Sequence, residues 1–320
     1  MEIKFDYIIK KIKNKIEIKK LKRFVFENNL YLQNIPKDKE HIKKILLYFP
    51  DYQMMHLGDH LFFEPLANHL KKNGYEIYIE PIKSMEFYFL ELGYNLDTLN
   101  NNTYDLVISR IEFYPTLKEI SFPILYIETA NTNIAKPLCF DIIEKTNKLL
   151  NIQAKQIVDI PKLINISDVI SDELLVIKNS NEKYIVFNNY IDSGSFRVFD
   201  KHFQKIKEFT KILKEKTGYK VIHTGSKNDK VKDKDNYNFV DIDLRGKSSI
   251  KDLFDLVQLD NIVCNVSFDA FQMHLFMIKN KKSYVLFRGR FTKKASNLLI
   301  NYFNPPFLYK RDKKCIIEYI

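Results

Sequence analysis

Short apolar runs alternate with amphipathic segments along most of the 320-residue chain, and this alternation restricts the folds that it can adopt. The apolar runs have the length and flanking turn residues of β-strands, and the segments between them have helical spacing. Such an alternation builds a parallel sheet with helices on both faces. Strands are expected at 44–49, 75–80, 104–109 and 123–128, and then at 184–190, 218–225, 239–244, 261–266 and 283–287; helices are expected near 59–73, 84–93, 136–151, 199–217, 248–258 and 269–279.

A polar stretch at 152–182 without a long period divides these elements into two series, and it is the expected interdomain linker. Length also favours two domains, because a single core seldom grows beyond roughly 250 residues. The prediction is an α/β protein with two Rossmann-like, doubly wound domains facing a cleft. Its parts are a basic N-terminal helical segment at 1–40, a first domain at 41–160 and a second at 161–320. Ligands of such sheets bind beyond the carboxyl ends of the strands.

The first 23 residues carry nine Lys or Arg against three Asp or Glu, whereas the formal net charge of +11 follows a richness in Lys found along the whole chain. Apolar residues in this segment, among them Phe5, Ile8 and Ile12, recur close to helical spacing. A basic amphipathic helix can lie on an anionic membrane surface. It can also pack on a domain with its lysines solvated, which is the commoner use of the pattern.

No apolar run approaches the roughly 20 residues that cross a bilayer, and the charged start lacks the apolar region of a signal peptide. A cytoplasmic protein is therefore expected, peripheral at the inner face of the membrane if the basic helix binds there. The cysteines have no paired or metal-like spacing, so buried thiols are predicted for Cys139, Cys264 and Cys315. The sequence ends in RDKKCIIEYI, which predicts a short strand.

The first strand-to-helix loop contains His56, Gly58, Asp59 and His60 ahead of a strongly amphipathic helix. Glycine lets the backbone approach a ligand closely or adopt a positive φ angle. An aspartate at a helix start can accept backbone N–H bonds as a cap, which by itself would explain Asp59. The two histidines have a spacing seen at metal sites, but no third ligand accompanies them, so no metal is predicted.

Two further loops suit parts of a nucleotide. NNYIDSGSFR at 188–197 offers the hydroxyl groups of Ser193 and Ser195 and the guanidinium of Arg197 ahead of a helix. These groups fit a phosphate, although an ordinary turn with an exposed arginine would use the same residues. HTGSKND at 223–229 places the carboxylate of Asp229 where ribose hydroxyls could bind. The charged run SKNDKVKDKDN, which starts within this loop, is expected to be a solvated turn region.

The fourth loop belongs to NVSFDAFQMHLFMIKNKK at 265–282, where a strand ends and a helix begins. Asp269 could cap this helix, and His274 lies near the same end. The N-terminal end of a helix favours an anion. A histidine that faces the core would explain His274 as well, and both interpretations stay open.

Together these loops resemble, in order and spacing, the GT-B glycosyltransferases of the ADP-heptose:lipopolysaccharide heptosyltransferase type. The resemblance covers most of residues 43–290. LGDHLFFEPLANHLKKNG is similar to the family's first loop and helix, with Gly-Asp followed by Pro65 and Leu70. The run VDIDLRGKSSIKDLFDLVQLDNIVCNVSFDAFQMHLFMIKNKKSYVLF resembles the nucleotide-binding half.

The resemblance implies that the first domain binds the acceptor and the second binds the nucleotide-sugar. It implies that Asp59 is the catalytic base, that Arg197 lies near the donor diphosphate, and that Asp229 contacts the donor nucleoside. Asp269 and His274 match the family's Asp and His around the diphosphate-binding helix start. The full expected donor set is Ser193, Ser195, Arg197, Asp229, Lys247, Asp269, Ala270, Phe271 and His274, and the expected acceptor set is His56, Gly58 and His60.

The sequence departs from the family at the diphosphate-binding helix. Where Asp-Thr-Gly is usual, this chain has Asp269-Ala270-Phe271. A hydroxyl is lost and a bulky ring replaces a small residue, so the donor pocket must differ and ADP-heptose itself is doubtful. Backbone N–H groups could still hold a phosphate.

The expected function is that of an inverting, metal-independent glycosyltransferase without a cofactor. It would move heptose or a related sugar from a nucleotide diphosphate donor to a hydroxyl of a glycan or glycolipid acceptor, as in a bacterial lipooligosaccharide or capsule. Such a transfer needs a base for the acceptor proton and a positive environment for the departing diphosphate. The alternative is a noncatalytic nucleotide-sugar-binding or nucleic-acid-binding module on the same scaffold; RRM and KH motifs are not visible, and no nucleic acid is expected.

Overall fold

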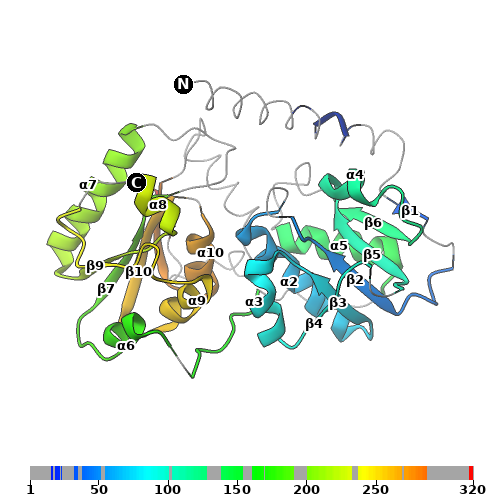
Figure 1. Ribbon diagram of the computed structural model, residues 1–320, viewed down its shortest axis with the longest axis horizontal. Coiled ribbons are helices and arrows are strands. Elements are labelled where there is room, and N and C mark those ends of the chain that lie inside the picture. Colours follow the sequence, from blue (N-terminus) through cyan, green and yellow to red (C-terminus); the bar gives the residue numbers. More distant parts are fainter. Residues whose placement is uncertain are drawn as a thin grey trace. The chain divides into compact units, whose positions relative to one another are not determined.

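The computed structural model describes residues 38–51, 55–100, 103–127, 138–153, 161–168, 170–190, 200–232, 237–268, 270–286 and 317–319, with a few positions between 16 and 34. The chain divides into two compact units, each with its own sheet (Figure 1). The units are not continuous in sequence, because the beginning of one long helix belongs to the second. The first unit comprises Met1–Met55, Leu66–Asn133 and Asp141–Ile157; the second comprises His56–Pro65, Ile134–Phe140 and Val158–Ile320.

The sheet of the first unit has the strand order β1-β6-β5-β2-β3-β4. All neighbours are parallel except β1, which is antiparallel to β6. After the short edge strand β1, the chain forms β2, adds β3 and β4 on one side of it, and then adds β5 and β6 on the other side. The order therefore reverses between β2 and β5. The strands are β1 (Leu32–Gln33), β2 (Lys44–Tyr48), β3 (Glu76–Glu80), β4 (Asn95–Leu96), β5 (Leu106–Arg110) and β6 (Ile124–Ile127).

Strands β2, β5 and β6 are almost wholly buried, as expected of parallel strands covered on both faces. The long helix α2 (Leu57–Lys72) follows β2 and contains Pro65 in its interior. Within the first unit, its C-terminal half is joined to α5 (Leu138–Leu150) by the side chains of His69 and Asn147, whose Nε2 and Oδ1 atoms are 2.6 Å apart. Shorter helical elements follow β3 and β5: η1 (Lys83–Met85), α3 (Glu86–Glu91), η2 (Ile111–Phe113) and α4 (Tyr114–Leu117).

The sheet of the second unit has the order β12-β11-β10-β7-β8-β9, and all its strands are parallel. Its strands are added in the same order as in the first sheet: the chain forms β7, adds β8 and β9 on one side of it, and then adds β10 on the other side. The order reverses between β7 and β10. The strands are β7 (Tyr184–Asn188), β8 (Lys220–His223), β9 (Ile242–Asp243), β10 (Ile262–Phe268), β11 (Lys282–Leu286) and β12 (Ile317–Tyr319).

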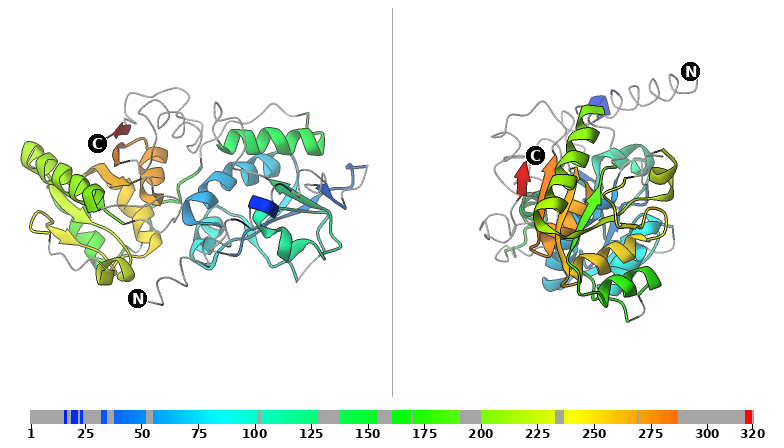
Figure 2. Two further views of the ribbon diagram at one scale, coloured as in Figure 1. Left: turned by 90° about the horizontal axis from the view of Figure 1, so that it is seen from above. Right: turned by 90° about the vertical axis from the view of Figure 1, so that its left-hand side faces the viewer.

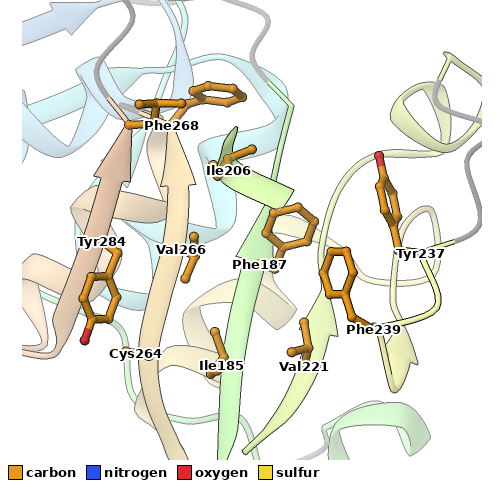
Figure 3. Packing of buried hydrophobic residues seen from close by; sticks show 11 residues of the cluster. Ile185, Phe187, Ile206, Val221, Tyr237, Phe239, Cys264, Val266, Phe268 and Tyr284 are labelled. Atoms are coloured by element: carbon orange, nitrogen blue, oxygen red, sulfur yellow. The ribbon is translucent and has the colours of Figure 1, made fainter. Parts of the chain in front are cut away.

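Helices flank this second sheet on both sides (Figure 2). Alternate residues of β10 show the division. Cys264, Val266 and Phe268 join an apolar cluster (Figure 3) that packs against α7 (Asp200–Thr217). Asn265 alternates with them and bonds to Gln272 in α10 (Phe271–Ile278). The remaining helices are α6 (Asp172–Lys178), α8 (Lys227–Lys232) and α9 (Ile250–Gln258), and α9 begins with a capping box formed by Ser249 and Asp252.

The predicted strand–helix alternation is confirmed in both series, as is the short strand near the C-terminus, which is β12. One expectation is wrong. The charged run after β8 was expected to be a solvated turn region, but its described part contains the helix α8 (Lys227–Lys232), because Ser226 and Asp229 cap the helix start reciprocally. The polar stretch 152–182, the expected linker, includes the short helix α6 (Asp172–Lys178).

Cys139 and Cys264 are buried thiols, as predicted, and burial raises the pKa of Cys264 to about 12. Most of the basic segment 1–40, and Cys315, lie outside the described residues. In the part of the chain that the structure describes, every helix falls short of the length or the apolar character needed to cross a bilayer.

Candidate active site

The carboxylate of Asp59 lies in the first turn of α2. Its Oδ2 atom accepts a hydrogen bond of 2.9 Å from the backbone N–H of His56, and the N–H of Asp59 donates to the carbonyl oxygen of His56 at 3.0 Å. An acidic group here also meets the positive end of the helix dipole. Asp59 thus caps the helix, as helix-start physics predicts. It is nevertheless only partly buried, so its carboxylate is not sealed inside the unit.

The structure brings the first and fourth predicted loops together at Gly58 and His274. A Cβ atom on Gly58 would lie 3.4 Å from Cδ2 and 3.7 Å from Nε2 of the His274 imidazole. The same imidazole packs edge-to-face on Phe62, with ring centroids 5.1 Å apart and an interplanar angle of 83°. His274 is 9% exposed. Its ring therefore lies against the start of α2, immediately before Asp59.

His56 and His60 have different surroundings. His60 is fully buried, and its Nδ1 atom lies 3.0 Å from the carbonyl oxygen of His56. His56 is partly buried and forms the residue ahead of the helix. His60 therefore contacts the backbone of the loop rather than solvent. Over the residues that the structure describes, no three His, Cys, Asp or Glu side chains gather as a metal site would require.

The start of α10 has no side-chain cap among the described residues. Ala270 occupies the N-cap position in extended conformation, with φ −133° and ψ 175°. The bulky ring of Phe271 is turned towards α9, where it packs on Phe254 with ring centroids 5.8 Å apart. The ring that departs from the family pattern is thus anchored against a buried neighbour. Four predicted donor-site residues, Ser193, Ser195, Arg197 and Asp269, lie outside the described residues.

Asp229, the predicted nucleoside contact, is engaged at the start of α8. Its Oδ2 atom accepts the backbone N–H of Ser226, and the side chain is 6% exposed. A side chain at the adjacent Gly225 would be crowded, because a Cβ atom there would lie 3.0 Å from Asp229 Oδ2 and 3.2 Å from Cγ of Arg245. The loops after β8 and β9 are joined by the N–H of Gly246, which donates to the carbonyl oxygen of Gly225 at 2.9 Å.

Lys247, in the loop after β9, is exposed. The nearby cation that sequence reasoning missed is Arg245, which is 7% exposed and forms a bidentate ion pair with Asp243. The two N–H···O distances are 3.0 and 3.1 Å. Its guanidinium also lies 5.5 Å from the ring centroid of Tyr237. Asp243 and Arg245 flank the apolar Leu244 in the sequence, and this spacing could have indicated that the two side chains pair.

Uncharged polar side chains occupy the carboxyl ends of β7, β8 and β10. Gln272 in α10 donates from Nε2 to Asn265 Oδ1 at 2.6 Å, and it accepts the hydroxyl hydrogen of Thr224. A second set joins His223, Asn189 and Tyr237: Nε2 of the histidine lies 3.0 Å from Asn189 Oδ1, and Asn189 Nδ2 donates to the Tyr237 hydroxyl at 2.8 Å. Sequence reasoning did not select these residues.

Burial, together with the charges of Arg245 and Lys207, lowers the pKa of His223 to about 3, against the opposing charge of Asp243. The imidazole is therefore neutral near pH 7. It packs beside Phe187 and Tyr237, with ring centroids 4.7 and 5.1 Å away. This neutral histidine supports the loop after β8 without adding charge to it.

Solved glycosyltransferases share this architecture, although no protein-family model and no curated protein matches the sequence. A glycosyl transferase of family 9 from Veillonella parvula has a TM-score of 0.59 at 13% identity, with 87% of each chain covered. The ADP-heptose lps heptosyltransferase II of E. coli has a TM-score of 0.57 at 14% identity, with 86% of this chain and 92% of that chain covered. Identities this low establish the fold, which is the two-sheet GT-B fold.

Proposed function

We propose that the protein is an inverting, metal-independent glycosyltransferase that moves a sugar from a nucleoside diphosphate donor to a hydroxyl of a glycan or glycolipid. The observation that supports this most is the contact of Gly58 with His274, in a chain with a glycosyltransferase fold. The contact supports a role for the partly exposed carboxylate of Asp59, which directly follows Gly58 in α2.

In the proposed reaction Asp59 takes the proton of the acceptor hydroxyl as its oxygen attacks the anomeric carbon of the donor. The bond from that carbon to the diphosphate oxygen breaks, and the nucleoside diphosphate leaves with the electron pair. One displacement of this kind inverts the anomeric carbon. General-base assistance contributes about 10²- to 10⁴-fold to such steps.

The negative charge of the leaving diphosphate is met by groups around α10. The first backbone N–H groups of this helix and its dipole favour an anion, and no side-chain cap among the described residues occupies them. Arg197 and Lys247 would add positive charge, and Ser193, Ser195, Asp269 and His274 would complete the donor site. The Phe271 ring packs on Phe254, with ring centroids 5.8 Å apart, and the donor site would have to accommodate it.

The finer assignments belong to the same proposal. The first Rossmann-like domain would bind the acceptor, a bacterial surface glycan such as lipooligosaccharide or capsule, with His56, Gly58 and His60 near it. The donor sugar would be heptose or a relative of it. The name of the E. coli neighbour gives ADP-heptose and lipopolysaccharide for that protein. Alanine and phenylalanine at 270 and 271 favour a different donor here.

Binding and product release test the proposal together. The full chain would be screened by thermal shift with ADP-, GDP-, UDP- and CDP-linked sugars, since a ligand that binds the native form raises its melting temperature. We expect one nucleotide class to raise it, and release of the matching nucleoside diphosphate when an acceptor glycan is added. Binding without release would favour a noncatalytic nucleotide-sugar-binding module, and no binding by any class would contradict both.

A further inference from the structure

Gln272 connects three elements at the carboxyl end of the second sheet. It is the second residue of α10 and is 4% exposed. Its side-chain oxygen accepts a hydrogen bond from the Thr224 hydroxyl, just after β8, and its nitrogen donates to Asn265 Oδ1 in β10 at 2.6 Å. One side chain therefore ties the first turn of the helix to the end of β8 and to the middle of β10.

The bonds continue on both sides of Gln272. Asn265 donates from Nδ2 to the Ser267 hydroxyl at 2.8 Å, and the Ser267 hydroxyl donates to the carbonyl oxygen of Phe268 at 2.8 Å. On the other side, Asn188 donates from Nδ2 to the carbonyl oxygen of Thr224 at 3.0 Å. Each amide and hydroxyl has a defined partner, and a satisfied buried network of this kind makes the structure locally rigid.

This network fixes the first turn of α10 through side-chain bonds to Thr224 and Asn265, and not through bonds to the helix N–H groups as a capping side chain would. Ala270 holds the N-cap position, where Ser, Thr, Asp or Asn is more usual. The anchoring side chains of Gln272, Thr224 and Asn265 carry no charge.

We propose that Gln272 is a positioning residue for the donor. By bonding to Thr224 and Asn265, it holds the first N–H groups of α10 in the orientation that binds the diphosphate of the nucleotide. The inference rests on the proposed function, because it assigns a role at the same donor site. It adds a residue that the family resemblance does not supply.

The test compares nucleoside diphosphate affinity in matched variants of the full chain. ADP, GDP, UDP and CDP are titrated by calorimetry, and the melting temperature of each variant is recorded. Gln272→Met keeps the length of the side chain but loses both hydrogen bonds, and it should weaken the affinity by about tenfold. Thr224→Val should weaken it similarly, whereas Thr224→Ser, which keeps the hydroxyl, should restore wild-type affinity.

Asn261 supplies the control at the opposite end of β10. Its Nδ2 atom donates to the carbonyl oxygens of Ile177 and Ser180 at 2.6 and 3.2 Å. Asn261→Ala should lower the melting temperature and leave the affinity unchanged.

The outcomes separate the two proposals. If the wild-type chain binds a nucleotide and both Gln272→Met and Thr224→Val bind it equally tightly, the positioning role is wrong and the proposed function stands. If Gln272→Met fails to fold, the Thr224→Val and Thr224→Ser pair decides by the same criterion. If the wild-type chain binds none of the four nucleotides, the proposed function fails and the positioning role falls with it.

Discussion

The two sheets have the same central strand order but different side chains at their carboxyl ends. In the first unit, Arg110 at the end of β5 forms a 2.9 Å ion pair with Glu112, and the two side chains are only 12% and 7% exposed. In the second unit, Gln272, Asn265 and Thr224 form an uncharged network. Topology therefore fixes where each edge lies, while the residues that follow the strands give it its chemistry.

This difference suits the proposed division of labour. An anionic diphosphate binds well at the first backbone N–H groups of a helix, and the network that holds the first turn of α10 consists of uncharged side chains. In the first unit, Ser109 joins β5 to β2 through a 2.8 Å bond from its hydroxyl to the carbonyl oxygen of Tyr48, and the charged pair follows directly.

The largest expected effect comes from breaking the charged pair of the first unit. Arg110→Met leaves the Glu112 carboxylate buried without this arginine, and loss of one partner of a buried pair costs about 3–5 kcal/mol. The free energy of unfolding of the first unit should fall by that order in calorimetry. The double change Arg110→Met with Glu112→Leu should recover most of the loss. A double variant as unstable as the single one would show that the pair is not the cause.

A smaller effect is expected in the second unit when the pH is lowered from 7 to 5. The pKa of His223 is lowered to about 3 in the folded protein, so the unfolded chain, with a histidine pKa near 6.5, binds the extra proton first. Stability is therefore fully present above pH 6.5 and falls as the pH drops towards 3, by up to about 1.4 kcal/mol per pH unit.

His223→Gln isolates this contribution, because the glutamine amide can still donate to Asn189 but does not titrate. Between pH 7 and pH 5 the variant should lose less stability than the wild-type chain in urea unfolding followed at both pH values. Equal losses would rule out His223 as the source.

The smallest effect is expected at Gly58, where the first turn of α2 meets His274. A Cβ atom 3.4 Å from the imidazole is in ordinary contact, and alanine is favoured over glycine in helices by up to about 1 kcal/mol. Gly58→Ala should therefore leave the melting temperature equal or slightly higher. Gly58→Leu, which reaches into the imidazole, should lower both the melting temperature and nucleotide affinity; unchanged values would contradict the packing.

The sequence predicts the strands well because buried parallel strands, such as 44–48 and 262–268, are apolar runs bounded by turn residues. The sequence-based prediction fails at α8, where a charged run suggested a turn. There Ser226 and Asp229 cap the start of a helix made largely of charged residues. The position of Asp59 at a helix start correctly predicts that its carboxylate accepts a backbone N–H, which is that of His56.

Gln272 could not be found from local pattern, because its partners Thr224 and Asn265 come from other elements. The available hint was the polar Asn265 within an otherwise apolar strand. Of the predicted donor residues, Ser193, Ser195, Arg197 and Asp269 lie outside the described part of the chain and remain predictions.

Release of nucleoside diphosphate by Asp59→Asn tests the central claim most directly. The asparagine oxygen can still accept the N–H of His56, so the helix cap is kept while the base is removed. With the donor identified by the screen and an acceptor glycan, we expect release to fall by about 10² or more, with nucleotide affinity unchanged. Release at the wild-type rate would contradict the role of Asp59 and, with it, the proposed mechanism.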